Sequence, residues 1–361
     1  MLINIADLVR VYFDIPPSQI LRYVQEEYGH LLEKGKRDEA DIVFIGVGKL
    51  HKKPRYVYFL EPVAYDDESV FWYDKMGRMA RIDFENFQNK IIQVHIDCEF
   101  DSHFLGIIME YLVSFRLLKH GACFCHASAI EYKGTRILFP AWRHAGKTNL
   151  MLHFLELGAR YVADDWVILY KDGSVLPLPK RLHLLYYNFM AYPSLVKGLE
   201  PEARALINFT KKAMEGEYDL DWDVIDAIRQ RIRYRRPIYE LGAEADYNKA
   251  QVGMIFLLQK EITDRNILEI KRRTAEVMSV LTQPILYFEQ MHFHNAYAAH
   301  KIRTGKPVPY LEKRNTTITD VLQESYKKTP FLYEVSFTAG TDVKKIADLI
   351  ENHMHEVSRV E

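Results

Sequence analysis

A short apolar run followed by a loop ending in Gly-Lys-Thr constrains this chain more than any other stretch. Residues 135–140 (Thr-Arg-Ile-Leu-Phe-Pro) have the composition of a buried strand, and a helical pattern starts near Lys147. Residues 141–148 match the phosphate-loop pattern G-x-x-x-x-G-K-[ST], except that alanine replaces the first glycine. Backbone N–H groups and the dipole at the start of such a helix favour a bound phosphate. The sequence therefore predicts a nucleotide-binding loop.

The lysine and the threonine at the end of the loop suggest specific roles in binding ATP. Lys147 is expected to reach the β- and γ-phosphates, and the Thr148 hydroxyl is expected to bind Mg²⁺. Alanine tolerates a positive φ less well than glycine, so Ala141 leaves open a loop that has lost nucleotide binding. The residues predicted to contact the nucleotide are Ala141, Trp142, Arg143, His144, Ala145, Gly146, Lys147 and Thr148.

The segment after the loop supports this prediction. Leu150, Phe154 and Leu157 give one apolar helical face, and Gly158 lies where a helix stop is expected. A second predicted strand, residues 160–163, ends in Asp164-Asp165. A carboxylate at the end of a strand beside a phosphate loop holds the metal or activates the acceptor in such sites. The alternative is a buried strand followed by a solvated acidic turn.

Several of these features occur in the order seen in one known family. His126-Ala-Ser128, a glycine-containing turn, the loop and Ala163-Asp164-Asp165 resemble HPr kinase/phosphorylase-like proteins, and residues 176–184 look like the Pro-rich strand that follows the acidic pair in their relatives. Those relatives include kinases encoded beside peptide-modification enzymes. The resemblance covers about residues 100–190. It departs from the family pattern at Ala141 and at Arg143-His144, where Gly and Ser-Gly are usual, and the segment that contacts HPr is not found.

This resemblance implies a P-loop core of the HPr-kinase/PEP-carboxykinase type, with ATP and Mg²⁺. The missing HPr-contacting segment argues against HPr itself as the acceptor. By resemblance, Asp164 is the catalytic base and Asp165 the metal-side ligand together with Thr148, although the reverse assignment stays open. On a continuing strand the two adjacent carboxylates would point in opposite directions. His126 is expected beside the strand that feeds the loop, where it orients an Asp or a phosphate or is simply a structural histidine.

The whole chain reads as mixed α/β, with two parts. Residues 1–100 form a strand-rich N-terminal subdomain, and residues 101–361 form the kinase-like core, interrupted by a helical insertion at about 199–250 that ends in an arginine cluster, 229–236. Strands are predicted at 41–46, 55–60, 69–73, 78–83, 91–96, 122–131, 135–139, 252–258, 267–270 and 331–337. Helices are predicted at 104–118, 201–214, 219–233 and 274–281, from Pro284 and from Thr341.

Composition excludes some classes of partner. The formal charge of the 361 residues is −1, which gives no general attraction to nucleic acid or to an acidic membrane. No apolar run is long enough to cross a bilayer, and no signal peptide is recognised. With three cysteines and no disulfide pattern, a reducing cytoplasm is predicted, and homo-oligomerisation is left open.

The function predicted from these observations is an ATP-dependent kinase. It would transfer the γ-phosphoryl group to a hydroxyl, serine being the first choice, of a peptide, a protein or a small metabolite. Lys147, Asp164 and His126 are the candidate catalytic residues. The alternatives are a nucleotide-sensing or partner-binding protein with a degenerate loop, and an ATP hydrolase.

Overall fold

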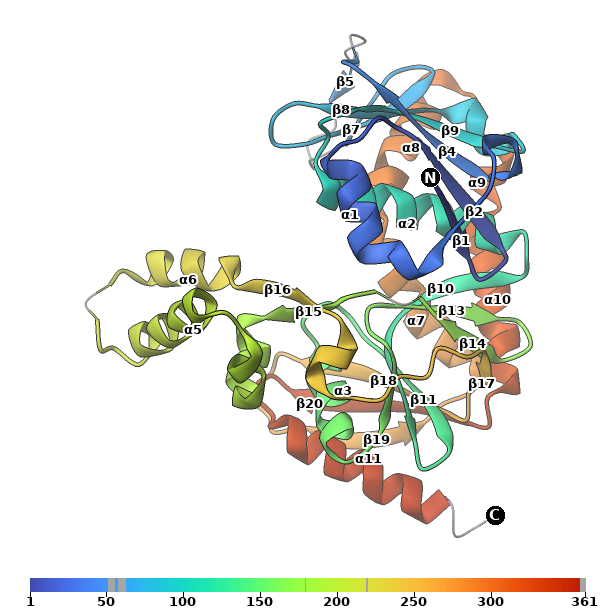
Figure 1. Ribbon diagram of the computed structural model, residues 1–361. Helices are drawn as coiled ribbons and strands as arrows, with labels where there is room; N and C mark the ends of the chain where they lie inside the picture. Colours follow the sequence, from blue (N-terminus) through green and yellow to red (C-terminus); the bar gives the residue numbers. More distant parts are fainter. Residues whose placement is uncertain (51–55, 58–62, 179, 219, 358–361) are drawn as a thin grey trace.

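Two large mixed β-sheets with helices packed on them make this a mixed α/β protein (Figure 1). The computed structural model describes residues 1–50, 56–57, 63–178, 180–218 and 220–357. Within the described residues, no helix combines the length and apolar character needed to span a membrane. The predicted α/β class is confirmed.

The N-terminal sheet has the strand order β3-β1-β2-β4-β9-β8-β7-β6-β5. Its strands are β1 (Leu2–Ile5), β2 (Val9–Asp14), β3 (Leu32–Glu33), β4 (Ile42–Val47), β5 (Tyr56–Val57), β6 (Val63–Tyr65), β7 (Ser69–Tyr73), β8 (Met79–Asp83) and β9 (Ile92–Asp97). The strands predicted between residues 41 and 96 are confirmed, except that residues 55 and 58–60 of the predicted strand 55–60 lie outside the described residues. Sequence reasoning missed helix α1 (Gln19–Tyr28), which begins where the Ser18 side chain accepts from the Leu21 amide.

The central sheet has the order β17-β14-β13-β10-β11-β18-β20-β19, with β12 also paired to β10. Its strands are β10 (Ala122–Tyr132), β11 (Thr135–Pro140), β12 (Arg160–Ala163), β13 (Trp166–Tyr170), β14 (Ser174–Pro177), β17 (Ala250–Gln251), β18 (Met254–Glu261), β19 (Leu268–Arg272) and β20 (Phe331–Thr338). The predicted hairpin is confirmed, because β10 and β11 pair from Ala127↔Pro140 to Tyr132↔Thr135. Strands β11, β18 and β20 run parallel, so their carboxyl ends meet at one edge of the sheet.

Helices cover both faces of the central sheet. On one face lie α3 (Lys147–Glu156) and α11 (Val343–Val357), which share a hydrophobic cluster with the sheet. The opposite face packs against α2 (Ser102–Leu118), α7 (Ala275–Glu289) and α10 (Arg314–Lys328). The same cluster continues into the N-terminal sheet, where it includes buried side chains of α1 and of α8 (Met291–Thr304). The C-terminal half of the chain thus helps to bury the N-terminal sheet.

One helical prediction in this region is wrong. A helix ending near Leu281 and a second one starting at Pro284 were expected, but α7 runs through Pro284 to Glu289. Proline removes the N–H that would bond to the carbonyl of Val280. Because Val280 and Pro284 are both exposed, that carbonyl can be solvated instead. The predicted start at Thr274 is confirmed, since its side chain accepts from the Val277 amide.

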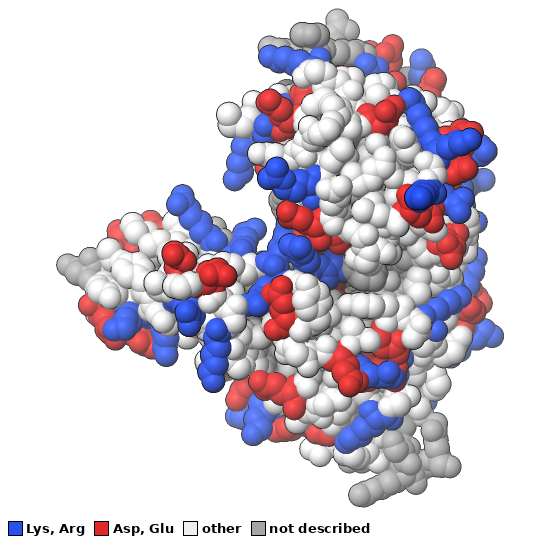
Figure 2. Space-filling view, in the orientation of Figure 1, with Lys and Arg blue, Asp and Glu red and all other residues white. Residues whose placement is uncertain are grey.

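An arm projects from the central sheet (Figure 1). It consists of β15 (Leu182–Leu185), α4 (Tyr186–Ala191), α5 (Pro201–Met214), α6 (Trp222–Arg231) and β16 (Arg233–Arg236), with β15 and β16 paired antiparallel. The two helices of the predicted insertion are confirmed. Figure 2 shows Lys and Arg side chains gathered in the hollow between the arm and the N-terminal sheet. Arg235 of β16 pairs with the buried Glu27 of α1, 3.1 Å away, and connects the arm to α1.

Candidate functional site

The Gly-Lys-Thr loop lies at the carboxyl end of β11 and leads directly into α3. Ala141 is buried and bridges to Leu258 of β18, so it still belongs to the sheet. The loop residues with positive φ are His144 (61°) and Gly146 (97°). Alanine is therefore compatible with the first position of the loop, where the pattern has glycine. The left-handed conformation is adopted by Gly146 and by His144, and histidine is one of the residues enriched at positive φ.

Gly146→Ala is expected to disturb the start of α3 through its backbone alone. At φ +97° a side chain is strained, although an added Cβ would meet no atom within 4 Å. We expect the free energy of unfolding to fall by about 1–2 kcal/mol and ATP binding to weaken. Gly134→Ala in the β10–β11 turn is the matched control, with φ +77° and equally open space. Urea unfolding should show a similar loss for both variants, and calorimetry should show weaker ATP binding only for Gly146→Ala; equal ATP affinities in the two variants would contradict this.

The acidic pair lies in a break between two strands that share a neighbour. Both β12 and β13 pair with β10, and the chain bends between them at Asp165, whose φ is 72°. The strand does not continue through the acidic pair, so the opposite directions expected on a continuing strand do not apply. Because the strand stops, both side chains turn toward the first turn of α3.

Two contacts join the acidic pair to the loop. Lys147 Nζ lies 2.8 Å from Asp165 Oδ1, and Thr148 Oγ1 donates to Asp164 Oδ2 at 2.9 Å. Ser128 Oγ on β10 donates to the carbonyl oxygen of Lys147 at 3.1 Å and fixes the start of the helix. Four of the residues predicted from sequence thus lie together, although they come from two separate segments of the chain.

The protonation states of the two aspartates differ. Burial, followed by repulsion from Asp165, raises the pKa of Asp164 to about 6. Burial would also raise the pKa of Asp165, but the Lys147 ammonium outweighs it and holds that pKa well below its usual range. Burial would lower the pKa of Lys147, whereas Asp165 and Asp164 together raise it. Asp165 and Lys147 are therefore both charged at neutral pH, and Asp164 is the carboxyl that can exchange a proton near neutral pH.

His126 lies beside the end of β11, the strand that feeds the loop, as predicted. Its Nδ1 is 2.9 Å from the carbonyl oxygen of Ala141, and its Nε2 is 3.8 Å from Asp165 Oδ1. Burial, and secondly the Lys147 ammonium, lower the pKa of His126 to about 3, so the ring is neutral at physiological pH. A carbonyl only accepts, so we assign the proton to Nδ1. The Nε2 lone pair then faces the Asp165 carboxylate, and the Nδ1–H bond to the Ala141 carbonyl connects His126 to the start of the loop.

Residues on α7 complete the site, and sequence reasoning missed them. Arg143 Nε donates to both carboxylate oxygens of Glu289, at 2.7 and 2.9 Å. The rings of Trp142 and Phe288 meet edge to face with centroids 5.7 Å apart. These partners follow the loop by more than 140 residues, and no motif in the sequence marks them.

A second group of missed residues connects the acidic pair to the N-terminal sheet. Lys180 pairs with Glu110 of α2 and helps to lower the pKa of Asp165. Glu110 also accepts from Trp166 Nε1 at 2.9 Å and from Tyr28 Oη at 3.2 Å. Helices α1 and α2 are thereby connected to the candidate site through Glu110 and Lys180.

The oxygen atoms near the loop suit Mg²⁺. Asp164 Oδ1 is buried and has no hydrogen-bond partner among the described residues, and Asp165 and Thr148 supply further oxygens. Mg²⁺ usually binds one or two carboxylates and completes its shell with phosphates and water. In the described part of the chain, no group of three or more His, Cys, Asp or Glu residues has the arrangement of a metal site. Any Mg²⁺ here would therefore need phosphate oxygens as well.

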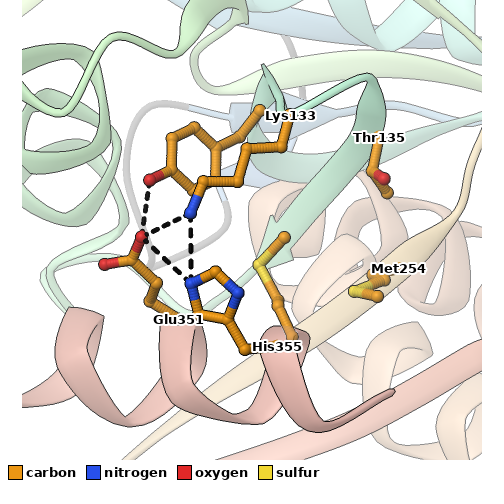
Figure 3. A pocket seen from close by; sticks show the side chains of 7 residues that line it. Lys133, Thr135, Met254, Glu351 and His355 are labelled. Carbon is orange, nitrogen blue, oxygen red and sulfur yellow. Dashed lines mark hydrogen bonds and ion pairs between the residues drawn. The ribbon is translucent and has the colours of Figure 1, made fainter. Parts of the chain in front are cut away.

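A shallow pocket at the opposite end of the β10–β11 hairpin is a weaker candidate (Figure 3). Glu351 accepts from Tyr132 Oη at 2.6 Å and from Lys133 Nζ at 2.9 Å, and Lys133 also contacts His355. Tyr132, Lys133, Glu351 and His355 interact with one another, whereas Thr135 lies apart from them (Figure 3). Among the described residues that line this pocket, none has a buried side-chain oxygen or nitrogen without a partner, as Asp164 Oδ1 is.

Comparison with known proteins adds no family assignment: no protein-family model matches this sequence, and no curated protein is significantly similar to it. The resemblance to HPr kinase/phosphorylase-like proteins stays a prediction from the residues themselves.

Proposed function

We propose that this protein is an ATP-dependent phosphotransferase with a phosphate-loop core of the HPr-kinase type. One observation carries the proposal. Lys147 and Thr148, at the N-terminus of α3, each contact one carboxylate of Asp164-Asp165, and one buried oxygen of that pair has no partner among the described residues. A lysine, a hydroxyl and a carboxylate around a helix N-terminus are the groups that position and neutralise a polyphosphate.

The reaction proposed is transfer of the γ-phosphoryl group to a hydroxyl of a peptide, a protein or a small metabolite. The acceptor oxygen forms a bond to the γ-phosphorus while the bond from that phosphorus to the β–γ bridging oxygen breaks, and ADP leaves. Asp164, with its pKa of about 6, accepts the hydroxyl proton. Lys147 exchanges Asp165 for phosphate oxygens and neutralises their charge.

The metal-side role falls to Asp165 and Thr148, with Asp164 adjacent. Bound Mg²⁺ would neutralise negative charge on the phosphates. The strongly lowered pKa of Asp165 suits this role, because such a carboxylate stays anionic and is a poor base. We place the reaction in the cytoplasm, where ATP and Mg²⁺ are supplied.

A second candidate function is partner binding or nucleotide sensing without transfer. The observation that favours it is the engagement of Trp142 and Arg143 by Phe288 and Glu289, which holds the loop in place through side chains. ATP hydrolysis without an acceptor is the third candidate.

Labelled ATP separates these functions. The purified full chain would be incubated with γ-³²P-ATP, Mg²⁺ and peptide or metabolite pools with and without hydroxyl groups. Label on a hydroxyl acceptor supports the kinase, and free phosphate alone supports the hydrolase. Binding of ATP with neither product supports the sensor. The absence of ATP binding by calorimetry would overturn the kinase, the hydrolase and the nucleotide sensor, and would favour a partner-binding protein with a degenerate loop.

A further inference from the structure

The rim of the loop carries aromatic surface that the hydrophobic core does not use. The Phe288 ring is 44% exposed although it lies near the C-terminal end of α7, where its neighbours Leu286 and Ile285 are buried. It meets the half-buried Trp142 ring edge to face, at an interplanar angle of 71°. Tyr287 is different, because its ring is stacked on His294 with centroids 4.7 Å apart. Phe288 therefore retains an open ring beside the loop.

The residues that follow Trp142 and Phe288 in the sequence, Arg143 and Glu289, locate the ring pair near the phosphate-binding groups. Arg143 and Glu289 form a two-pronged ion pair directly after Trp142 and Phe288. Glu289 is close enough to Lys147 and Asp165 for both charges to affect its pKa, which burial raises above its usual value. The end of α7 thus lies near the start of α3, and the aromatic pair is adjacent in sequence to the ion pair on both segments.

A nucleotide held by its phosphates at α3 must place its base outside the loop. Bases have two flat apolar faces that gain free energy by stacking on exposed aromatic rings. We propose that Phe288 and Trp142 form the stacking surface for the base of the bound nucleotide. This inference rests on the proposed function, since it requires the phosphates at Lys147 and Thr148.

The chemistry of the surface also defines its selectivity. Stacking accepts any base. In the described part of the chain, the polar side chains next to the ring pair in sequence are Arg143 and Glu289, which bind each other. ATP and GTP should therefore bind with similar affinity. Both should bind more tightly than inorganic tripolyphosphate, which has the phosphates but no base.

Calorimetry with the full chain tests this inference. Mg²⁺ complexes of ATP, GTP and tripolyphosphate would be titrated into the wild type, Phe288→Ala and Phe288→Leu, the last of which keeps apolar volume without an aromatic face. We expect both variants to bind ATP and GTP about 10-fold more weakly, the loss of one base–aromatic stack, and tripolyphosphate unchanged. Val280→Ala is the control, because Val280 is 63% exposed on the same helix.

Three results would overturn the inference. Unchanged ATP affinity in Phe288→Leu and Phe288→Ala removes the stacking role. A parallel loss of tripolyphosphate affinity shows that the substitution only disturbs the loop. Wild-type protein that binds tripolyphosphate as tightly as ATP has no base subsite, whereas protein that binds none of the three ligands overturns the proposed function itself.

Discussion

Lys147→Ala is expected to lower the rate of phosphoryl transfer by about 10³-fold or more, the scale of losing a charged group that stabilises the transition state. The Lys147 ammonium is 2.8 Å from Asp165, its side chain is 9% exposed, and no other cation contacts the acidic pair as directly among the described residues. Initial rates with labelled ATP and the identified acceptor would measure the loss. Lys271→Ala on β19, where the lysine is exposed, is the matched control.

The same substitution should leave the fold intact. It deprives Asp165 of its counter-charge, but the Asp165 side chain is 31% exposed, so water can solvate the carboxylate. The double variant Lys147→Ala/Asp165→Asn should recover any lost stability without recovering activity. Transfer at the wild-type rate by Lys147→Ala would end the proposal that this loop binds the transferred phosphate.

Asp164→Asn is expected to reduce kcat by about 10²- to 10⁴-fold, the usual contribution of a general base, with a much smaller change in ATP affinity. In the wild type, kcat/KM should fall tenfold per pH unit below about pH 6, because the base is inactive once Asp164 is protonated. His126 should add no second inflection to the pH profile of kcat/KM above pH 6, since its pKa is about 3. Steady-state kinetics between pH 5 and 9 would show both effects. Full activity of Asp164→Asn together with loss of activity in Asp165→Asn would reverse the two roles.

The stability of Asp164→Asn provides an independent check on the raised pKa. The folded protein holds the Asp164 proton up to about pH 6, whereas the unfolded chain releases it near pH 4. The unfolding free energy of the wild type therefore falls as the pH rises through this window. Above it, the folded protein bears the full cost of an ionised, buried Asp164. The unfolding free energy of the variant minus that of the wild type should therefore be about 2–3 kcal/mol larger at pH 7 than at pH 4. Urea unfolding at the two pH values measures this difference, and a difference of zero would contradict the raised pKa.

Patterns confined to neighbouring residues were sufficient to predict much of the central sheet. The β10–β11 hairpin, the start of α3 at Lys147 and strand β12 follow from apolar periodicity and from Gly134, Gly146 and Gly158, all of which have positive φ. Leu157 shows where such patterns fail. It was predicted on the buried face of α3 but is exposed, because the helix ends at Glu156 and the chain turns away at Gly158.

The directions of the two carboxylates required the tertiary structure. Sequence reasoning placed Asp164 and Asp165 at the end of one strand but did not predict how the chain continues. In the structure, β10 pairs with β12 and β13 separately and leaves a bend between them. That bend brings both side chains to Lys147 and Thr148. Their unequal pKa values follow from this arrangement, since burial and charge depend on what surrounds each carboxylate rather than on its neighbours in sequence.

The sequence by itself determined the chemical groups of the candidate site: a glycine with positive φ, a lysine, a hydroxyl and two carboxylates on short segments. The tertiary structure decided which groups meet, because the contacts of Trp142 and Arg143 with Phe288 and Glu289 and of Lys180 with Glu110 join distant segments. Hydrogen-bond propensity and helical or strand periodicity act over a few residues and can be recognised locally. Burial and electrostatic coupling depend on the packing of the whole chain, so the protonation of Asp164 and the aromatic rim of the loop became visible only in the folded protein.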